Sequence, residues 1–181
     1  MNDHVDHAID VHTHYFPQAF LDLIEKHGPA HGFEYKMVEG KGPQFRHGHL
    51  MTGPVGPKFV DLDARLAAMD EQGVQVHAMS LSQPMVYWGE GSLAQRLTET
   101  YNDALAQAHA RHPQRLIGLA TLPMHETALA VKEIERAAKL PGMRGFYVAT
   151  QVRGKDLPDA AFLPVYERIE ASGRPLFLPP V

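Results

Sequence analysis

Short apolar runs alternate with amphipathic segments along most of this chain. The first run, residues 8–12, follows polar residues and is too short for a helix, so it is predicted to be a strand. The same reasoning predicts strands at residues 74–81, 115–122, 144–150 and 176–178. Apolar residues at helical spacing predict helices at residues 18–27, 61–72, 92–112, 126–140 and 160–172.

Residues 29–59 interrupt this pattern. Gly and Pro are frequent there, as in Gly40-Lys41-Gly42-Pro43. We expect a long irregular insertion, with a short hairpin formed by residues 33–38 and 44–49. Loops of this length inside a compact domain usually have a function, often as a lid or a binding loop.

The alternation of strands and helices predicts parallel β-α-β units with right-handed crossovers. A doubly wound sheet and a (β/α)8 barrel both fit. No Gly-x-Gly-x-x-Gly or Walker-type loop follows a predicted strand. This weakens the case for a doubly wound sheet that binds a nucleotide. A complete barrel takes roughly 250 residues, whereas the 181 residues here contain five predicted strands.

Composition narrows the classes of partner. The formal net charge is -4 and the basic residues are scattered, so neither nucleic acid nor an anionic membrane is expected as a partner. The absence of cysteine excludes disulfides and thiolate metal sites. A polar, acidic start and the lack of a long apolar run lead us to expect a cytoplasmic protein. Twelve histidines are a high number for this length, and histidine is the commonest metal ligand.

The end of the first predicted strand carries the clearest chemical signal, Asp10-Val11-His12-Thr13-His14. Residues two apart on a strand share a face, so His12 and His14 are predicted to reach one metal ion. The carboxyl end of a barrel strand is where active sites form. Asp10 lies two residues before His12 and so is expected on the same strand face. There it is expected to support the metal site by accepting a hydrogen bond from a ligand. The alternative is a pair of surface histidines in a polar turn.

With these residues in view, the chain resembles the amidohydrolase-related family (amidohydrolase 2) typified by 2-amino-3-carboxymuconate 6-semialdehyde decarboxylase. The segments that carry the resemblance cover nearly the whole chain. They are Ile9–Pro17, Arg65–Ser80, Asn102-Asp103, His112–Ala120 and Gly142–Gly145.

The resemblance implies a (β/α)8 TIM-barrel-type metal-dependent hydrolase fold, with the N-terminal five β/α units in residues 1–181 and the C-terminal units missing. It also implies one divalent metal, zinc or alternatively manganese, held by His12 and His14. The third ligand of the family is a His at the end of the fifth strand, where this chain has Pro179, which has no donor atom to offer a metal. The catalytic His and an Asp ligand are expected beyond Val181.

The activity that the resemblance implies is non-oxidative decarboxylation of an aromatic or muconate-like carboxylic acid, a small-molecule substrate. A metal-dependent hydrolase or hydratase of the same family is the alternative. For the substrate, Arg46 could pair with a carboxylate, although a solvated loop Arg is the simpler interpretation. Trp88 could form a pocket wall or simply pack in the core. Further candidates, considered weaker, are Ser80, Ser82, Tyr87, His47 and His49, while His77 is expected to be a core histidine.

A different class of function follows from the strand count. Five strands of eight leave two sheet edges unpaired, which parallel sheets do not tolerate well. The chain could therefore be an incomplete or degenerate barrel, inactive alone. We expect such a chain to form a homo-oligomer or to associate with a complementary barrel half.

Overall fold

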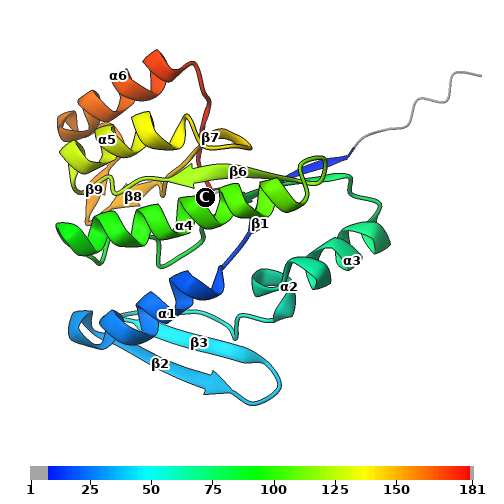
Figure 1. Cartoon of the computed structure of the whole chain (residues 1–181). Helices are drawn as coiled ribbons and strands as arrows, with labels where there is room; N and C mark the ends of the chain where they lie inside the picture. Colours follow the sequence, from blue (N-terminus) through cyan, green and yellow to red (C-terminus); the bar gives the residue numbers. More distant parts are fainter. Residues whose placement is uncertain (1–7, 180–181) are drawn as a thin grey trace, which may run out of the picture.

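The computed structural model describes residues 8–179 (Figure 1). Its centre is a five-stranded sheet, in which every pairing is parallel and the strand order is β1-β5-β6-β7-β10. These strands are β1 (Ile9–His14), β5 (Val76–Ser80), β6 (Leu116–Thr121), β7 (Met143–Tyr147) and β10 (Leu176–Phe177). The spatial order repeats the order along the chain without the reversal of a doubly wound sheet. The barrel prediction is therefore confirmed, with five strands present.

A helix follows each of the first four strands, and the predicted helices are confirmed to within a few residues at their ends. The helices are α1 (Gln18–His27), α2 (Pro57–Val60), α3 (Leu62–Gln72), α4 (Ser92–Arg111), α5 (Thr127–Ala137) and α6 (Leu163–Ser172), with 3-10 turns η1 (Gly28–His31) and η2 (Ala160–Phe162). Local chemistry sets the ends of α3: the Asp61 side chain accepts hydrogen bonds from two backbone N–H groups of the first turn, and Gly73 ends the helix in the left-handed conformation. In Figure 1, α5 lies between α4 and α6, and α1 packs below α4.

The insertion is more regular than its sequence suggests. It forms an antiparallel sheet of β2 (Phe33–Val38), β3 (Gly42–His47) and β4 (Leu50–Met51), which lies beside α1 in Figure 1. The first two strands match the expected hairpin. The sheet is tied to the core because Phe33 and Phe45 are buried, and the Phe45 ring lies 6.0 Å from that of Phe16.

A second small hairpin, β8 (Gln151–Val152) and β9 (Lys155–Asp156), follows β7 and was not predicted. Its two turn residues, Arg153 and Gly154, have φ values of 50° and 79°. Two positive φ angles suit a tight hairpin turn, but an Arg at the first position lacks the usual Asn or Asp signal.

Within the described chain, β1 and β10 are each hydrogen bonded to a strand on one side only. Near these free edges Ile9, Val11 and Leu178 are exposed to 56%, 48% and 46%. The expected pair of open edges is thus present between residues 8 and 179. No helix in the same part of the chain is long and apolar enough to cross a membrane.

Candidate metal centre and substrate pocket

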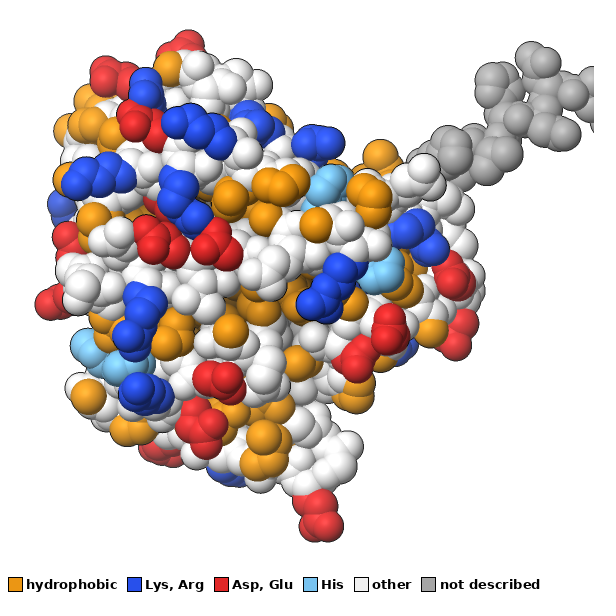
Figure 2. Space-filling view, viewed as in Figure 1, with side chains coloured by type: hydrophobic (Ala, Val, Ile, Leu, Met, Phe, Trp, Pro, Cys, Tyr) orange, Lys and Arg blue, Asp and Glu red, His pale blue; other side chains and the backbone are white. Residues whose placement is uncertain are grey.

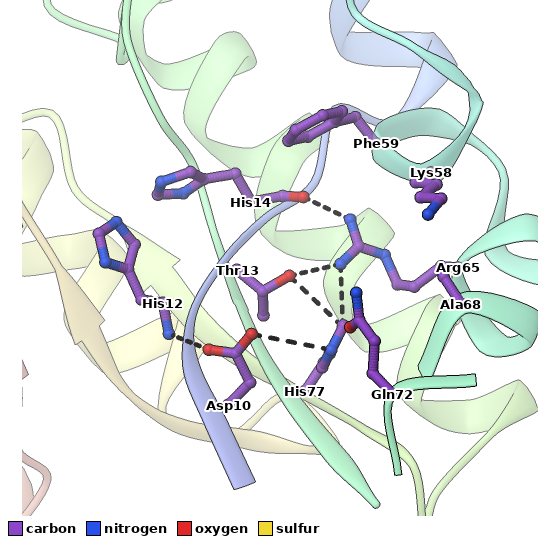
Figure 3. Close-up of a pocket in the computed structure, with 10 residues that line it drawn as sticks. All are labelled: Asp10, His12, Thr13, His14, Lys58, Phe59, Arg65, Ala68, Gln72 and His77. Atoms are coloured by element: carbon purple, nitrogen blue, oxygen red, sulfur yellow. Dashed lines mark hydrogen bonds and ion pairs between the residues drawn. The ribbon is translucent and has the colours of Figure 1, made fainter. Parts of the chain in front are cut away.

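The end of β1 is bent by a register shift against β5. Asp10 is opposite His77 and Thr13 is opposite Met79, so three steps on β1 match two on β5. Such a bulge moves a side chain to the other face of its strand. Asp10 therefore shares a face with Thr13. In Figure 3 the rings of His12 and His14 project on the opposite side of β1 from Thr13.

The bulge changes the contact expected for Asp10. Its Oδ1 accepts a hydrogen bond from the backbone N–H of His12 at 2.8 Å, and its Oδ2 lies 3.9 Å from Nε2 of His77. The parity argument assumed a regular strand, which this segment is not. Asp10 thus supports the main chain of His12, and the structure gives it no hydrogen bond to either predicted ligand ring.

His12 and His14 lie side by side at the carboxyl end of β1. Their ring centroids are 5.2 Å apart and their planes are nearly perpendicular, at 76°. His12 is exposed, whereas His14 is half-buried, with Nδ1 3.0 Å from Oγ of Ser80. Burial lowers the pKa of His14 below its ordinary value, and the neighbouring His12 acts in the same direction. Neutral imidazole, the form that binds metals, is thereby favoured.

Both rings line a cavity of about 170 Å³, here called the ligand hollow. Its wall is formed by the ends of β1, β7 and β10 and by the loop after β5: His12, His14, Ser82, Gln83, Met85, Tyr147, Ala149 and Pro179. The hollow thus lies at the carboxyl ends of the strands, where a barrel enzyme builds its active site. Pro179 lies in the same hollow as the two histidines, as the resemblance requires of the position of the third ligand.

The donor set fits two positions of a metal site. Two imidazoles share the ligand hollow with Pro179, the residue at which the resemblance predicts a third ligand. Among residues 8–179 no group of three or more His, Asp or Glu side chains is arranged to hold an ion. A catalytic zinc usually has three protein ligands, so this chain by itself provides an incomplete set.

A larger cavity, the apolar hollow, opens beside His14 and measures about 510 Å³. This size is in the range of small-molecule sites. Segment 50–55 of the insertion forms one part of the lining, and Phe16, Ser82 and Gln83 are in the rest of it. The insertion therefore shapes a pocket next to a predicted metal ligand.

A third cavity, the edge hollow, of about 390 Å³, lies between β1 and the helices α2 and α3 and is shown in Figure 3. Its deepest charged group is Arg65 of α3, which is only 3% exposed. The guanidinium donates to Oγ1 of Thr13 at 2.6 Å, to Nδ1 of His77 at 3.2 Å and to the carbonyl oxygen of His14. His77 is accordingly a core histidine, as expected.

Arg65 was not identified as a site residue from the sequence, although it lies in one of the segments that carry the resemblance. The sequence does contain a signal that points to Arg65. It is three residues after Leu62 and four before Met69, which places a cation on the apolar face of the predicted helix. A buried cation in such a position needs a set of acceptors.

The predicted substrate residues lie away from the three hollows. Arg46 is on β3, exposed, with Nη1 3.8 Å from Oε1 of Glu34. Trp88 is buried, with its ring 4.9 Å from that of Phe33, which is a packing contact.

The weaker candidates are distributed over several environments. Ser80 contacts His14, and Ser82 lines the ligand hollow. The buried Tyr87 hydroxyl accepts a hydrogen bond from the N–H of Ala149, and burial raises its pKa well above the ordinary value. His47 stacks on Phe33 with centroids 4.4 Å apart, and His49 is exposed.

Surface charge agrees with the composition. On the face shown in Figure 2, Lys and Arg side chains are interspersed with Asp and Glu side chains. This face therefore presents no single-sign patch of the kind that attracts nucleic acid.

The chain is similar in sequence to known proteins. The sequence profile of the family described as Amidohydrolase matches residues 9–179. The 2-amino-3-carboxymuconate-6-semialdehyde decarboxylase of Dictyostelium discoideum is 30% identical over 182 residues, which cover 95% of this chain and 48% of that protein. The chain thus spans about half the length of the curated relatives it matches.

Two solved structures extend the match to the fold. The 5-carboxyvanillate decarboxylase LigW from Sphingomonas paucimobilis is 28% identical, with a TM-score of 0.76, and 96% of this chain covers 52% of it. The apo form of Metarhizium anisopliae IDCase has a TM-score of 0.79 at 23% identity, with coverage of 96% and 50%. The half-barrel, the His-x-His strand end and the profile match over residues 9–179 lead to one conclusion: this chain belongs to the amidohydrolase family.

Proposed function

We propose that this chain supplies the N-terminal half of the barrel of a metal-dependent decarboxylase that acts on an aromatic or muconate-like carboxylic acid. The observation that carries the proposal is the pair of imidazoles, His12 and His14, in one hollow at the carboxyl ends of the strands. Decarboxylation is preferred over hydrolysis or hydration because the relatives named above include decarboxylases of carboxymuconate and carboxyvanillate compounds.

His12 and His14 would hold one divalent ion. Zinc suits a site of imidazole and carboxylate ligands, and manganese is the alternative, since the dihydroxybenzoic acid decarboxylase of Polaromonas sp. JS666 contains bound manganese. When bound, such an ion polarises a carboxylate or carbonyl oxygen as a Lewis acid.

The residues of this chain would bind and orient the substrate around that site. The apolar hollow, with its wall of residues 50–55, suits the carbon skeleton of a ring or a muconate chain. That Arg46 pairs with the carboxylate of the substrate stays a prediction. Its exposed ion pair with Glu34 is worth little, so the guanidinium is available to exchange partners. Trp88 likewise stays a prediction as a pocket wall.

Completion of the site requires more ligands than this chain contributes in residues 8–179. The free edges of β1 and β10 are suited to pair with a complementary barrel half or with a second copy of the chain. We therefore expect negligible turnover from residues 1–181 alone. Robust release of CO2 from an aromatic acid by pure protein of this length would contradict that expectation.

Metal content tests the proposal. The chain is dialysed against zinc or manganese, passed through a gel-filtration column and analysed for metal. We expect weak binding of one ion in the wild type and its loss in the double variant His12→Ala, His14→Ala. The matched control is His47→Ala, His49→Ala, which removes the same spacing from the insertion. Equal metal content in the first double variant and the wild type would refute the assignment.

A further inference from the structure

Side chains reinforce the strand pairing that holds the main chain around the predicted metal ligands. β1 pairs with β5 alone among the described strands, and the register shift between Asp10 and Thr13 interrupts that pairing beside His12. A bulged edge strand has fewer ladder hydrogen bonds than a regular central one. The pairs of Thr13 with Met79 and His14 with Ser80 remain. Three side chains, from Asp10, Ser80 and Arg65, add hydrogen bonds to this main chain.

Ser80 makes two contacts that bear on where the proton of His14 lies. Its Oγ is 3.2 Å from the carbonyl oxygen of Thr13 and 3.0 Å from Nδ1 of His14. A carbonyl oxygen only accepts, and a hydroxyl has one proton to donate. With that proton on the Thr13 carbonyl, the hydroxyl oxygen accepts from Nδ1–H of His14. The lone pair of Nε2 is then free for a metal.

Arg65 holds the next peptide group. It donates to the carbonyl oxygen of His14, while Ser80 donates to that of Thr13. The peptide planes on both sides of His14 are therefore fixed from α3 and β5. The other hydrogen-bond partners of this guanidinium, Thr13 and His77, are neutral acceptors. Within residues 8–179 no carboxylate lies within hydrogen-bond distance of this guanidinium, and a buried cation without such a partner is costly. The neutral acceptors beside His14 therefore hold it in place.

We propose that Ser80 and Arg65 are positioning residues that preset His14 as an Nε2 metal ligand. Ser80 sets the tautomer and the ring, and Arg65 sets the peptide that follows it. The inference rests on the proposed function for its consequence, since a preset ligand matters only where a metal binds. The tautomer itself is a property of the metal-free chain and is measured separately.

The first experiment is nitrogen NMR of the histidine rings in the metal-free chain, at a pH of about 8, where an ordinary histidine is neutral. We expect His14 to carry its proton on Nδ1 in the wild type and in Ser80→Thr, which keeps the hydroxyl. Ser80→Ala is expected to shift the proton toward Nε2. A proton on Nε2 in the wild type, or an unchanged tautomer in Ser80→Ala, would overturn the proposal.

The second experiment measures zinc affinity by competition with a chromophoric chelator. Ser80→Ala is expected to weaken binding about 10–100-fold, the usual effect of losing a hydrogen-bond partner of a ligand. Arg65→Lys, which lacks the forked donor, is expected to weaken it as well. Thr98→Ala is the control because it also removes a buried hydroxyl, one that donates to the carbonyl oxygen of Ala94 within α4.

The two proposals fail in different ways. A wild-type chain that binds no zinc but shows the Nδ1–H tautomer contradicts the metal function and leaves the arrangement of His14 supported. A wild type that binds zinc with an affinity unaffected by Ser80→Ala contradicts the positioning role. Should Arg65→Lys fail to fold, as judged by circular dichroism, the Ser80 variants still decide the question.

Discussion

Replacing Asn102 by Ala removes a side chain that joins three elements of the half-barrel. Asn102 lies on α4 and is 0% exposed. Its Nδ2 donates to the carbonyl oxygen of Thr121 at 3.0 Å and to Oε1 of Glu133 at 2.6 Å, and its Oδ1 accepts from the N–H of Thr121 at 2.9 Å. The amide thus connects α4 to the end of β6 and to α5.

The cost of the change can be worked out from these partners. Ala leaves the N–H and the carbonyl oxygen of Thr121 without this partner in a buried place. Each such group costs about 1–3 kcal/mol when it is left unsatisfied. Oε1 of Glu133 keeps a hydrogen bond from Arg136 at 2.9 Å, so it adds less. We expect a loss of about 3–5 kcal/mol, a large part of the roughly 5–15 kcal/mol that stabilises a typical domain.

Urea unfolding followed by circular dichroism measures this loss as a lower midpoint at an unchanged slope. The neighbouring Asp103 provides a matched control, because its half-exposed carboxylate bonds Arg136 at 2.5 Å at the edge of the same network. Asp103→Ala is expected to cost at most about 1 kcal/mol. A cost below about 1 kcal/mol for Asn102→Ala, or equal costs for the two variants, would refute the reasoning.

Three further outcomes are expected. Burial lowers the pKa of His125, and among residues 8–179 its buried Nδ1 has no hydrogen-bond partner. As the pH falls, the unfolded chain therefore takes up the proton first, and the wild type should lose stability below a pH of about 6.5. Denaturant titrations should show a smaller loss in His125→Gln than in the wild type. Equal losses in the two proteins would contradict this. Gly42→Ala should lower the free energy of unfolding by about 1–3 kcal/mol more than Gly40→Ala, measured by urea unfolding. A Cβ at Gly42 would lie 2.3 Å from the carbonyl oxygen of Val55, whereas Gly40 has open space. Pro179→His should raise zinc affinity at least about tenfold, since it adds a donor to the ligand hollow. Unchanged binding would show that position 179 does not reach the metal.

The sequence by itself determined the elements and the family of this protein. Helix and strand periodicities are local properties, so the alternating pattern placed the main strands and helices within a few residues. The His12-x-His14 spacing likewise needs only a strand end to bring two rings together. The sequence also predicts that Pro179 stands at the position of a third ligand, because a motif compares residue types, which the sequence states directly.

The tertiary structure alone decided which groups surround those rings. Register is set between strands, so the bulge that turns Asp10 toward His77 has no local signature in β1. The contacts of Arg65 and Ser80 with the Thr13–His14 main chain join residues more than 50 positions apart. The insertion folds as a sheet because Phe33 and Phe45 are buried in the core of the half-barrel. Metal-site geometry depends on such long-range packing, and sequence spacing does not report it.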